Sequence, residues 1–261
     1  MKTPSLWKGD FLGLNSFELA ENSTKKLLPE NIQLPENLVL GKRAERFFAE
    51  AISQTNSYEI IAENIQIIHE KQTLGEFDFF LKETHCEQIF HVELVYKFYV
   101  YDPSIENELN RWIGPNRKDS LVRKINHLKN HQLPLLFREE SLASLKELKL
   151  SPKKIEQKVC FKANLFVPKK LQHSSFSYIN QNCIVGFWLH LNEFSAEEYA
   201  GFQFYSPKKK DWSIEPTNHH EWKNYTEINK EINYLFQHKK AALLWMKKDE
   251  HTFERFFVVW W

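Results

Sequence analysis

Two segments with alternating side chains, within residues 75–100, constrain the fold of this chain more than any other part of its sequence. The segments GEFDFFLKE and QIFHVELVYKFYV alternate apolar and polar residues with a period of two, which predicts two β-strands. A tight two-residue turn at His85 and Cys86 would join them into a hairpin. Partner residues then have numbers that sum to 171, which brings Asp78 directly opposite Glu93.

The hairpin is predicted to have one apolar face and one polar face, because successive side chains of a strand point to opposite sides. The apolar face would hold Phe77, Phe79, Leu81, Phe90, Val92, Leu94, Tyr96 and Phe98. The polar face would hold Glu76, Asp78, His91, Glu93, Val95 and Lys97. Such a split predicts a sheet that packs its apolar face on the core.

The two facing acids, Asp78 and Glu93, suggest a metal site. Carboxylates directly opposite each other on neighbouring strands have Cβ atoms about 5 Å apart, and such like charges destabilise a sheet. A cation such as Mg²⁺ or Mn²⁺ offsets this repulsion, because it takes one or two carboxylates, keeps several waters and leaves room for a substrate phosphate. The bound cation can activate a water and neutralise charge on a phosphodiester. Lys97, on the same predicted face, could orient that water or hold the phosphate.

A simpler interpretation of the polar face stays open. An antiparallel hairpin with one face in solvent often carries acids and lysines only because that face is wet. A turn one residue longer would also shift the register and separate the two acids. Among further candidates, His91 and Glu76 could be ligands or make ordinary hydrogen bonds, and Gln132 could reach the site from a following helix.

Net charge and the absence of targeting segments limit the compartment and the partners. The chain of 261 residues carries 35 Lys and Arg against 34 Asp and Glu, so its net charge of +1 does not indicate a polyanionic partner. No apolar run approaches the roughly 20 residues of a membrane span, and the first residues lack the pattern of a signal peptide. Three widely spaced cysteines argue against a disulfide framework. We expect a cytoplasmic protein with no membrane partner.

A local basic patch is predicted on residues 111–132, which contain six basic residues and one acid, Asp119. Part of this segment, from about Asp119 to His131, has the apolar spacing of a helix, with Asp119 as its cap. Its basic residues could contact the phosphates of a nucleic acid, although a solvated helix face is the plain alternative. The residues concerned are Arg117, Lys118, Arg123 and Lys124.

Composition divides the chain into three consecutive ranges. Residues 1–37 are expected to form an extension packed on the body, because LLPENIQLPEN contains two prolines. Residues 38–150 would form a core that begins with an amphipathic helix, ENLVLGKRAERFFAEAISQT, and one strand, YEIIAENIQIIHEK, bent at Asn64. Residues 155–261 would form an aromatic-rich α+β unit with strands VCFKANLFVP, CIVGFWLHLNEF, YAGFQFY and TFERFFVVWW and one helix, NYTEINKEINYLFQHKKA. The expected fold class is mixed α/β, of the α+β kind.

The core resembles a known superfamily. A helix with an acid, a strand, and then GEFDF and HVELVYK resemble the restriction-endonuclease-like PD-(D/E)XK nucleases, whose core has the order α-β-β-β-α-β. The strings LGKRAERFF, LGEFDFFL, HVELVYKFYV, WIGPNRKDSLVRKINHL and HQLPL resemble the bacterial family called domain of unknown function 1853. The resemblance implies that Asp78 and Glu93 bind the metal, that Glu45 adds an acid from the first helix, and that Lys97 is the general lysine. The superfamily places its lysine two residues after the acid, whereas Lys97 lies four residues after Glu93.

Three functions follow as expectations. The first is a Mg²⁺- or Mn²⁺-dependent nuclease acting on DNA or RNA, with Asp78, Glu93, Glu45 and Lys97 as its catalytic residues. The second is a protein of nuclease-like fold that binds nucleic acid without turnover, which the displaced lysine favours. The third is a partner-binding protein whose aromatic second unit forms an interface.

Overall fold

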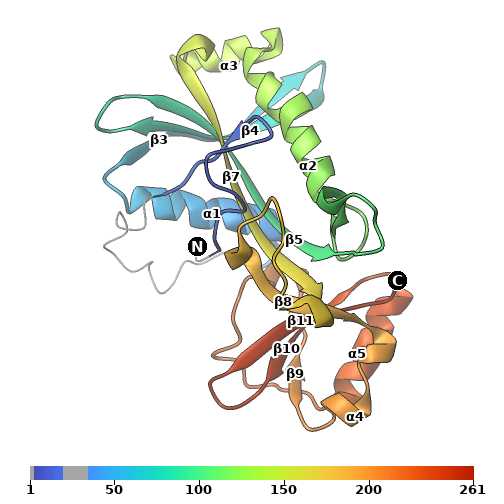
Figure 1. Cartoon of the computed structure of the whole chain (residues 1–261). Coiled ribbons are helices and arrows are strands. Elements are labelled where there is room, and N and C mark those ends of the chain that lie inside the picture. The colour runs from blue at the N-terminus through green and yellow to red at the C-terminus, as the bar shows by residue number, and fades with distance from the viewer. Residues whose placement is uncertain (1–2, 20–34) are drawn as a thin grey trace. The chain divides into compact units, whose positions relative to one another are not determined.

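The computed structural model describes residues 3–19 and 35–261 of the chain (Figure 1). The chain divides into two compact units that are interleaved in sequence. The first unit is Met1–Tyr96 with Arg123–Ala163, and the second unit is Lys97–Val122 with Asn164–Trp261. The predicted ranges 1–37, 38–150 and 155–261 run consecutively, whereas these units exchange segments, because strands β5 and β7 each begin in the first unit and end in the second.

The first unit is built on antiparallel strands covered by helices (Figure 1). Its strands occur in the order β3-β4-β5-β7, and β3, β4 and β5 are antiparallel neighbours. Its elements are β1 (Asp10–Phe11), β2 (Leu14–Asn15), α1 (Leu40–Ser53), β3 (Tyr58–His69), β4 (Gln72–Glu83), β5 (Ile89–Tyr101), α2 (Leu121–His127), α3 (Leu142–Glu147) and β7 (Ile155–Pro168).

The predicted first helix is confirmed as α1, which lies against β3 (Figure 1). Apolar residues recur every three or four positions and form one buried face, whose members include Ala44, Phe48 and Ile52. Phe48 packs against Phe79 of β4 with ring centroids 4.8 Å apart. Burial of this stripe, rather than helix propensity alone, holds α1 on the sheet.

The register of the hairpin is confirmed, but its turn is not the predicted one. The paired residues of the two strands, such as Phe80 opposite His91, have numbers that sum to 171. The strands end at Glu83 and Ile89, and the backbone N–H of Glu83 still donates to the carbonyl of Gln88. A four-residue loop, 84–87, therefore replaces the two-residue turn. Glu87 closes it with a positive φ of 60°, and because the loop is two residues longer, one on each side, the register is unchanged.

The simpler interpretation, in which the polar face of the hairpin lies in solvent, is wrong, because Asp78, His91 and Glu93 are buried. Both faces are covered: Phe79, Leu81, Phe90 and Val92 pack with Phe48 and Ile52 of α1, whereas Phe80 packs with Leu135, Leu136 and Leu145 beyond α2. Phe77 belongs to the second cluster, since its ring lies 5.1 Å from Phe80 and 5.0 Å from His91. The helical segment after β5 thus buries the face that alternation predicted to be polar.

Strand β3 is one strand with local irregularities, as predicted. Asn64 has a positive φ of 56°, a conformation that asparagine tolerates better than most residues. The pairing with β4 shifts between Ile60 and Ala62 and again between Ile67 and Ile68.

The predicted helix near 119–131 is present but is not uniform. Helix α2 ends at His127, a π-helical turn covers Leu128–Gln132, and a 3₁₀ turn with Pro134 follows at Leu133–Phe137. Asp119 does not act as the simple cap that was predicted, because its carboxylate accepts from Lys97 and from the backbone N–H of Ser120. Wide π turns change the direction in which side chains leave a helix, and here the turn ends at Gln132.

The second unit is a mixed sheet with helices α4 and α5 packed on it (Figure 1). Its strands occur in the order β7-β8-β11-β10-β9; β8 is parallel to both β7 and β11, and the other pairs are antiparallel. Its elements are β6 (Trp112–Ile113), β8 (Ile184–His190), α4 (Ala196–Tyr199), β9 (Gln203–Tyr205), α5 (Tyr225–Gln237), β10 (Ala242–Lys247) and β11 (Phe253–Val259). Strand β6 pairs with β5. Ile228 and Ile232 of α5 pack on this sheet.

The described part of the predicted N-terminal extension packs along β7. The backbone N–H groups of Leu6 and Phe17 donate to the carbonyls of Phe161 and Val159, and both side chains are buried. The proline-rich stretch expected to cross the body falls largely within 20–34, outside the described residues. No helix in the described ranges is long and apolar enough to cross a membrane.

Candidate functional site

The candidate acids Asp78 and Glu93 lie on the neighbouring strands β4 and β5 of the first unit. The observed pairing of the two strands ends at Phe79 opposite Val92, and Asp78 and Glu93 are the next residues beyond that pair. Asp78 Oδ2 accepts a hydrogen bond from the backbone N–H of Leu94 at 2.8 Å. This bond ties the Asp78 carboxylate to the peptide that follows Glu93, so the structure brings the two predicted acids together.

Glu93 is completely buried, and polar side chains satisfy both of its oxygens. Its Oε1 lies 2.9 Å from His91 Nε2, and its Oε2 accepts from Gln132 Nε2 at 2.5 Å. The Gln132 Oε1 atom in turn accepts from the ammonium of Lys124 at 2.5 Å. A buried carboxylate is costly unless such donors replace water. The network therefore stabilises Glu93 at a site where a bare acid would destabilise the fold.

The contacts of His91 fix its tautomer. Gln157 Nε2, which can only donate, lies 3.0 Å from His91 Nδ1 and 2.8 Å from the carbonyl of Leu133. Exchanging the oxygen and nitrogen of the Gln157 amide would bring two acceptor oxygens together, that of Gln157 and the carbonyl of Leu133. The amide nitrogen is therefore the atom that faces both Leu133 and His91. His91 Nδ1 is therefore an acceptor, and Nε2 carries the proton that is donated to Glu93. His91 is a neutral orienting group with both ring nitrogens engaged.

The close approach of the two acids is one of the causes of a raised pKa at Asp78. Burial, the charge of Glu93 and the charge of Glu45 raise the pKa of Asp78 from 3.8 to about 8, against the opposing effects of the Leu94 N–H and of Lys124. Asp78 accordingly holds a proton over most of the neutral range when no cation is near. A divalent cation would compete with that proton, because it stabilises the ionised carboxylate.

Glu45 and Glu76 share a cation that the sequence did not single out, Lys42 of α1. Its ammonium lies 2.8 Å from Glu45 Oε2, 2.5 Å from Glu76 Oε1 and 2.8 Å from Asn64 Oδ1. Burial raises the pKa of Glu45 and outweighs the opposing effect of Lys42. Glu45 thus influences Asp78 electrostatically, and Glu76 forms an ion pair with Lys42.

Lys97 lies in the second unit and forms an ion pair there. Its ammonium is 2.6 Å from Asp119 Oδ2, and each side chain is about one-third exposed. The predicted basic patch is likewise divided between the units. In the second unit Arg117 pairs with Asp102 at 2.9 Å and its guanidinium lies 4.4 Å from the ring centre of Trp261, whereas Lys124 joins the Glu93 network through Gln132 in the first.

The oxygens available to a metal are those of Asp78 and Glu93. Among the described residues no three His, Cys, Asp or Glu side chains are grouped to hold a metal ion. Two carboxylates are enough for Mg²⁺, which usually retains several waters. Such an ion would require Asp78 to lose its proton, and it would meet a Glu93 carboxylate that His91 and Gln132 orient.

Gln157 and Lys42 are the site residues that the sequence did not indicate. Gln157 lies on β7, 66 positions after His91, and Lys42 lies 34 positions before Glu76, so no local pattern connects them to the hairpin. Gln132, in contrast, was a sequence candidate, and the structure brings it to Glu93.

Comparison with known proteins gives one match. A family model described as "Domain of unknown function (DUF1853)" matches residues 3–259, which is almost the whole chain. No curated protein and no solved structure matches the chain. The family resemblance first suggested by strings such as LGEFDFFL and HVELVYKFYV therefore extends over both units. The chain belongs to the family described as domain of unknown function DUF1853.

Proposed function

We propose that this protein is a divalent-metal-dependent phosphodiesterase that cleaves nucleic acid, of the PD-(D/E)XK type. The observation that carries the proposal is the pair of carboxylates of Asp78 and Glu93, held side by side in a buried setting that raises the pKa of Asp78 to about 8. Strands do not keep facing acids in this way without an offsetting cation or proton. Perturbed carboxylates of this kind concentrate at functional sites.

The order of elements supports the same proposal. The chain order α1, β3, β4, β5, α2 and β7 follows the α-β-β-β-α-β order of the superfamily, with short elements inserted. Asp78 and Glu93 lie on the second and third of these strands, and Glu45 lies on the first helix. These are the elements on which the resemblance places the metal-binding acids.

The roles of the residues follow from their contacts. Asp78 and Glu93 would hold Mg²⁺ or Mn²⁺, which supplies an activated water and neutralises charge on the phosphodiester. His91 donates to Glu93 Oε1 and Gln132 donates to Oε2, so these two residues orient the carboxylate. Lys124 stabilises the Gln132 amide in the orientation that donates to Glu93. Lys97 remains the proposed general lysine.

Basic side chains near the acids would attract the nucleic acid backbone. Of the proposed contacts, Arg123 and Lys124 belong to the first unit with the acids, and Arg117 and Lys118 belong to the second. Affinity should then fall as salt concentration rises, because bound phosphates release counterions.

The test is cleavage of single- and double-stranded DNA and RNA with Mg²⁺ or Mn²⁺ by the wild type and by Asp78→Asn. The variant should lose at least a hundredfold in rate, because Asn is a poor ligand for a hard cation. Manganese binding, followed by the paramagnetic signal of the free ion, should weaken in parallel. Glu70→Gln, an exposed change at the β3–β4 turn of the same sheet, should leave both unchanged. Cleavage that persists in Asp78→Asn removes the proposed mechanism.

A second function, binding of nucleic acid without cleavage, is favoured because the polar groups of the site are already paired with each other. Both oxygens of Glu93 already accept hydrogen bonds, and Lys97 is paired with Asp119. A protein of this fold that binds nucleic acid without turnover would show salt-dependent affinity and no metal-dependent cuts on any substrate. Cuts that disappear in Asp78→Asn would exclude it.

A further inference from the structure

The ammonium of Lys42 is surrounded by side-chain oxygens from α1, β3 and β4. It lies 2.8 Å from Glu45 Oε2 on its own helix, 2.5 Å from Glu76 Oε1 on β4 and 2.8 Å from Asn64 Oδ1 on β3. Carboxylate and amide oxygens are also the ligands that a hard divalent cation takes in proteins. The ammonium therefore occupies a position whose surroundings suit a cation.

Glu45 depends on this ammonium more than an acid in open solvent would. Its side chain is only 15% exposed, and its Oε2 atom is buried and accepts no hydrogen bond among the described residues. Burying a carboxylate is costly unless a partner compensates its charge. The ion pair with Lys42 supplies that compensation.

The ammonium of Lys42 is also held in place and kept charged. It donates hydrogen bonds to Glu76 Oε1 and to Asn64 Oδ1. Burial acts to lower the pKa of Lys42, but its pairing with Glu45 and Glu76 raises that pKa above the ordinary value. Asn64 has a positive φ of 56°, so β3 departs from regular strand geometry at the residue that contributes the neutral oxygen.

Lys42 and its partners lie beside the pair Asp78 and Glu93. Glu76 and Asp78 are two positions apart on β4, so their side chains leave the same face of the strand. The charge of Glu45 acts on Asp78 and contributes to its raised pKa. Four carboxylates therefore influence one another in this region of the first unit, and Lys42 compensates two of them.

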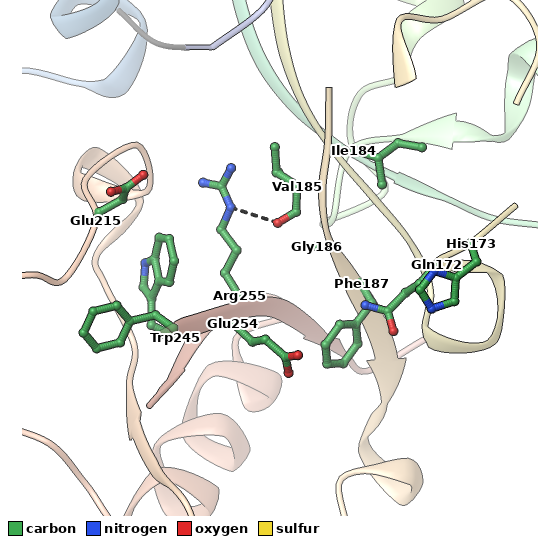
Figure 2. Close-up of a pocket in the computed structure, with 11 residues that line it drawn as sticks. Gln172, His173, Ile184, Val185, Gly186, Phe187, Glu215, Trp245, Glu254 and Arg255 are labelled. Carbon is green, nitrogen blue, oxygen red and sulfur yellow. Dashed lines mark hydrogen bonds between the residues drawn. The ribbon is translucent and has the colours of Figure 1, made fainter. Parts of the chain in front are cut away.

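Charged side chains of the second unit lie in a different setting. A cavity of about 490 Å³ in that unit is lined by Glu215, Trp245 and Arg255, among other residues (Figure 2). Glu215 is exposed, so water screens its charge. Arg255 donates to the neutral carbonyl oxygen of Val185, drawn as a dashed line in Figure 2. The buried Glu45, in contrast, needs a cation at close range.

We propose that Lys42 is a built-in counter-cation of the acid site, which takes the position of a second divalent ion and leaves room for one ion at Asp78 and Glu93. The inference deepens the proposed function and rests on it for that one ion. A lysine ammonium suits this role, because it is a compact point charge with three donors. Lys42 is then a positioning residue, since it acts on the site through Glu45 and Glu76.

Counting the Mn²⁺ ions that the whole chain binds tests this role. The paramagnetic signal of the free ion is followed while Mn²⁺ is titrated into the wild type and into Lys42→Ala. The wild type should bind one ion per chain. Lys42→Ala should bind two, because removal of the ammonium leaves the oxygens of Glu45, Glu76 and Asn64 to a second ion. Mn²⁺ should also raise the unfolding temperature of Lys42→Ala more than that of the wild type.

Three control variants locate the second ion. Lys42→Arg keeps the positive charge and should bind one ion, as the wild type does. Lys82→Ala removes a lysine of similar exposure that pairs with Glu87, and it should also bind one ion. Lys42→Ala combined with Asp78→Asn should keep the ion gained by the loss of Lys42, whereas Asp78→Asn alone should gain none. Circular dichroism checks that each variant is folded.

The inference is overturned if Lys42→Ala binds no more ions than the wild type, or if the wild type already binds two. The proposed function fails on a different result, because a wild type that binds no Mn²⁺ removes the ion at Asp78 and Glu93 even where Lys42→Ala gains one. The ion of the wild type thus tests the proposed cleavage site, and the ion gained by Lys42→Ala tests the counter-cation.

Discussion

The acid site of the first unit and the cavity of the second unit treat buried polar groups in different ways. Glu93 is fully buried, and each of its oxygens accepts from a neighbouring side chain, His91 or Gln132. Trp245 is almost as buried, yet its Nε1–H has no acceptor among the described residues. The difference teaches that a saturated network holds a group in position, whereas an unsatisfied buried donor destabilises the fold because nothing replaces the water that it lost.

The largest effect on stability is expected from removing the buried carboxylate of Glu93. Glu93→Ala leaves the His91 N–H and the Gln132 amide without their acceptor, so the free energy of unfolding should fall by about 3–5 kcal/mol. Urea denaturation at neutral pH measures it. Glu70→Ala, whose side chain is 84% exposed, should change the same quantity by less than about 0.5 kcal/mol. Equal stability of the two variants would show that Glu93 is not held in a buried network.

The next largest effect is a pH dependence of the unfolding free energy, caused by Asp78. Asp78 has a folded-state pKa of about 8 and an unfolded value near 3.8, so between these values the folded chain retains a proton that the unfolded chain has released. The contribution of this group to stability is therefore highest below about pH 4 and falls by about 1.4 kcal/mol for each pH unit until the pH passes 8. Asp78→Asn, which keeps an oxygen to accept from the Leu94 N–H, should remove this slope.

Denaturation of the wild type and of Asp78→Asn from pH 5 to pH 9 measures the slope. The variant should become the more stable of the two as the pH rises. Parallel curves for the two proteins would mean that Asp78 ionises normally and that the acids are not coupled.

A smaller effect separates two tryptophans of the second unit. Trp188 Nε1 donates to the carbonyl of Tyr101 at 2.9 Å, whereas the Trp245 N–H is unpaired among the described residues. Both side chains are buried, so Trp188→Phe should cost about 1–2 kcal/mol more unfolding free energy than Trp245→Phe. Thermal unfolding of the two variants gives the comparison. A larger cost for Trp245→Phe would indicate that its N–H is paired.

The smallest stability effect is expected for Lys97. Its ion pair with Asp119 is partly exposed on both sides, so Lys97→Met should change the unfolding free energy by less than about 1 kcal/mol. The proposed function expects nuclease activity to fall in the same variant. Full activity would assign the role of general lysine elsewhere, and Lys42, beside Glu45 and Glu76, would then be the next variant to assay.

Local patterns predicted several parts of the fold correctly. The register of strands β4 and β5 was predicted from a two-residue turn at His85 and Cys86, and it is correct because the four-residue loop 84–87 has the same centre. The helical spacing of α1 was equally clear. Strand β10 was not predicted, since Ala242–Met246 are all buried between β11 and β9 and show no alternation.

The candidate site was predictable only in part. Asp78 and Glu93 were found because the hairpin register is local, and the structure brings them together. The burial of their face was missed, because it depends on Leu135 and Leu136, which reach the sheet from a turn that follows α2. Lys42 and Gln157 were missed for the same reason, since each contacts the hairpin from a separate element.

The sequence by itself determined where strands and helices form and which residues of the hairpin face each other, because these depend on the period of side chains along one segment. Only the tertiary structure decided that the acids are buried, that His91 is neutral, and that Trp245 lines a cavity. Those properties depend on elements that are distant in sequence, whose packing removes water and so sets the cost of leaving each charge or N–H unpaired.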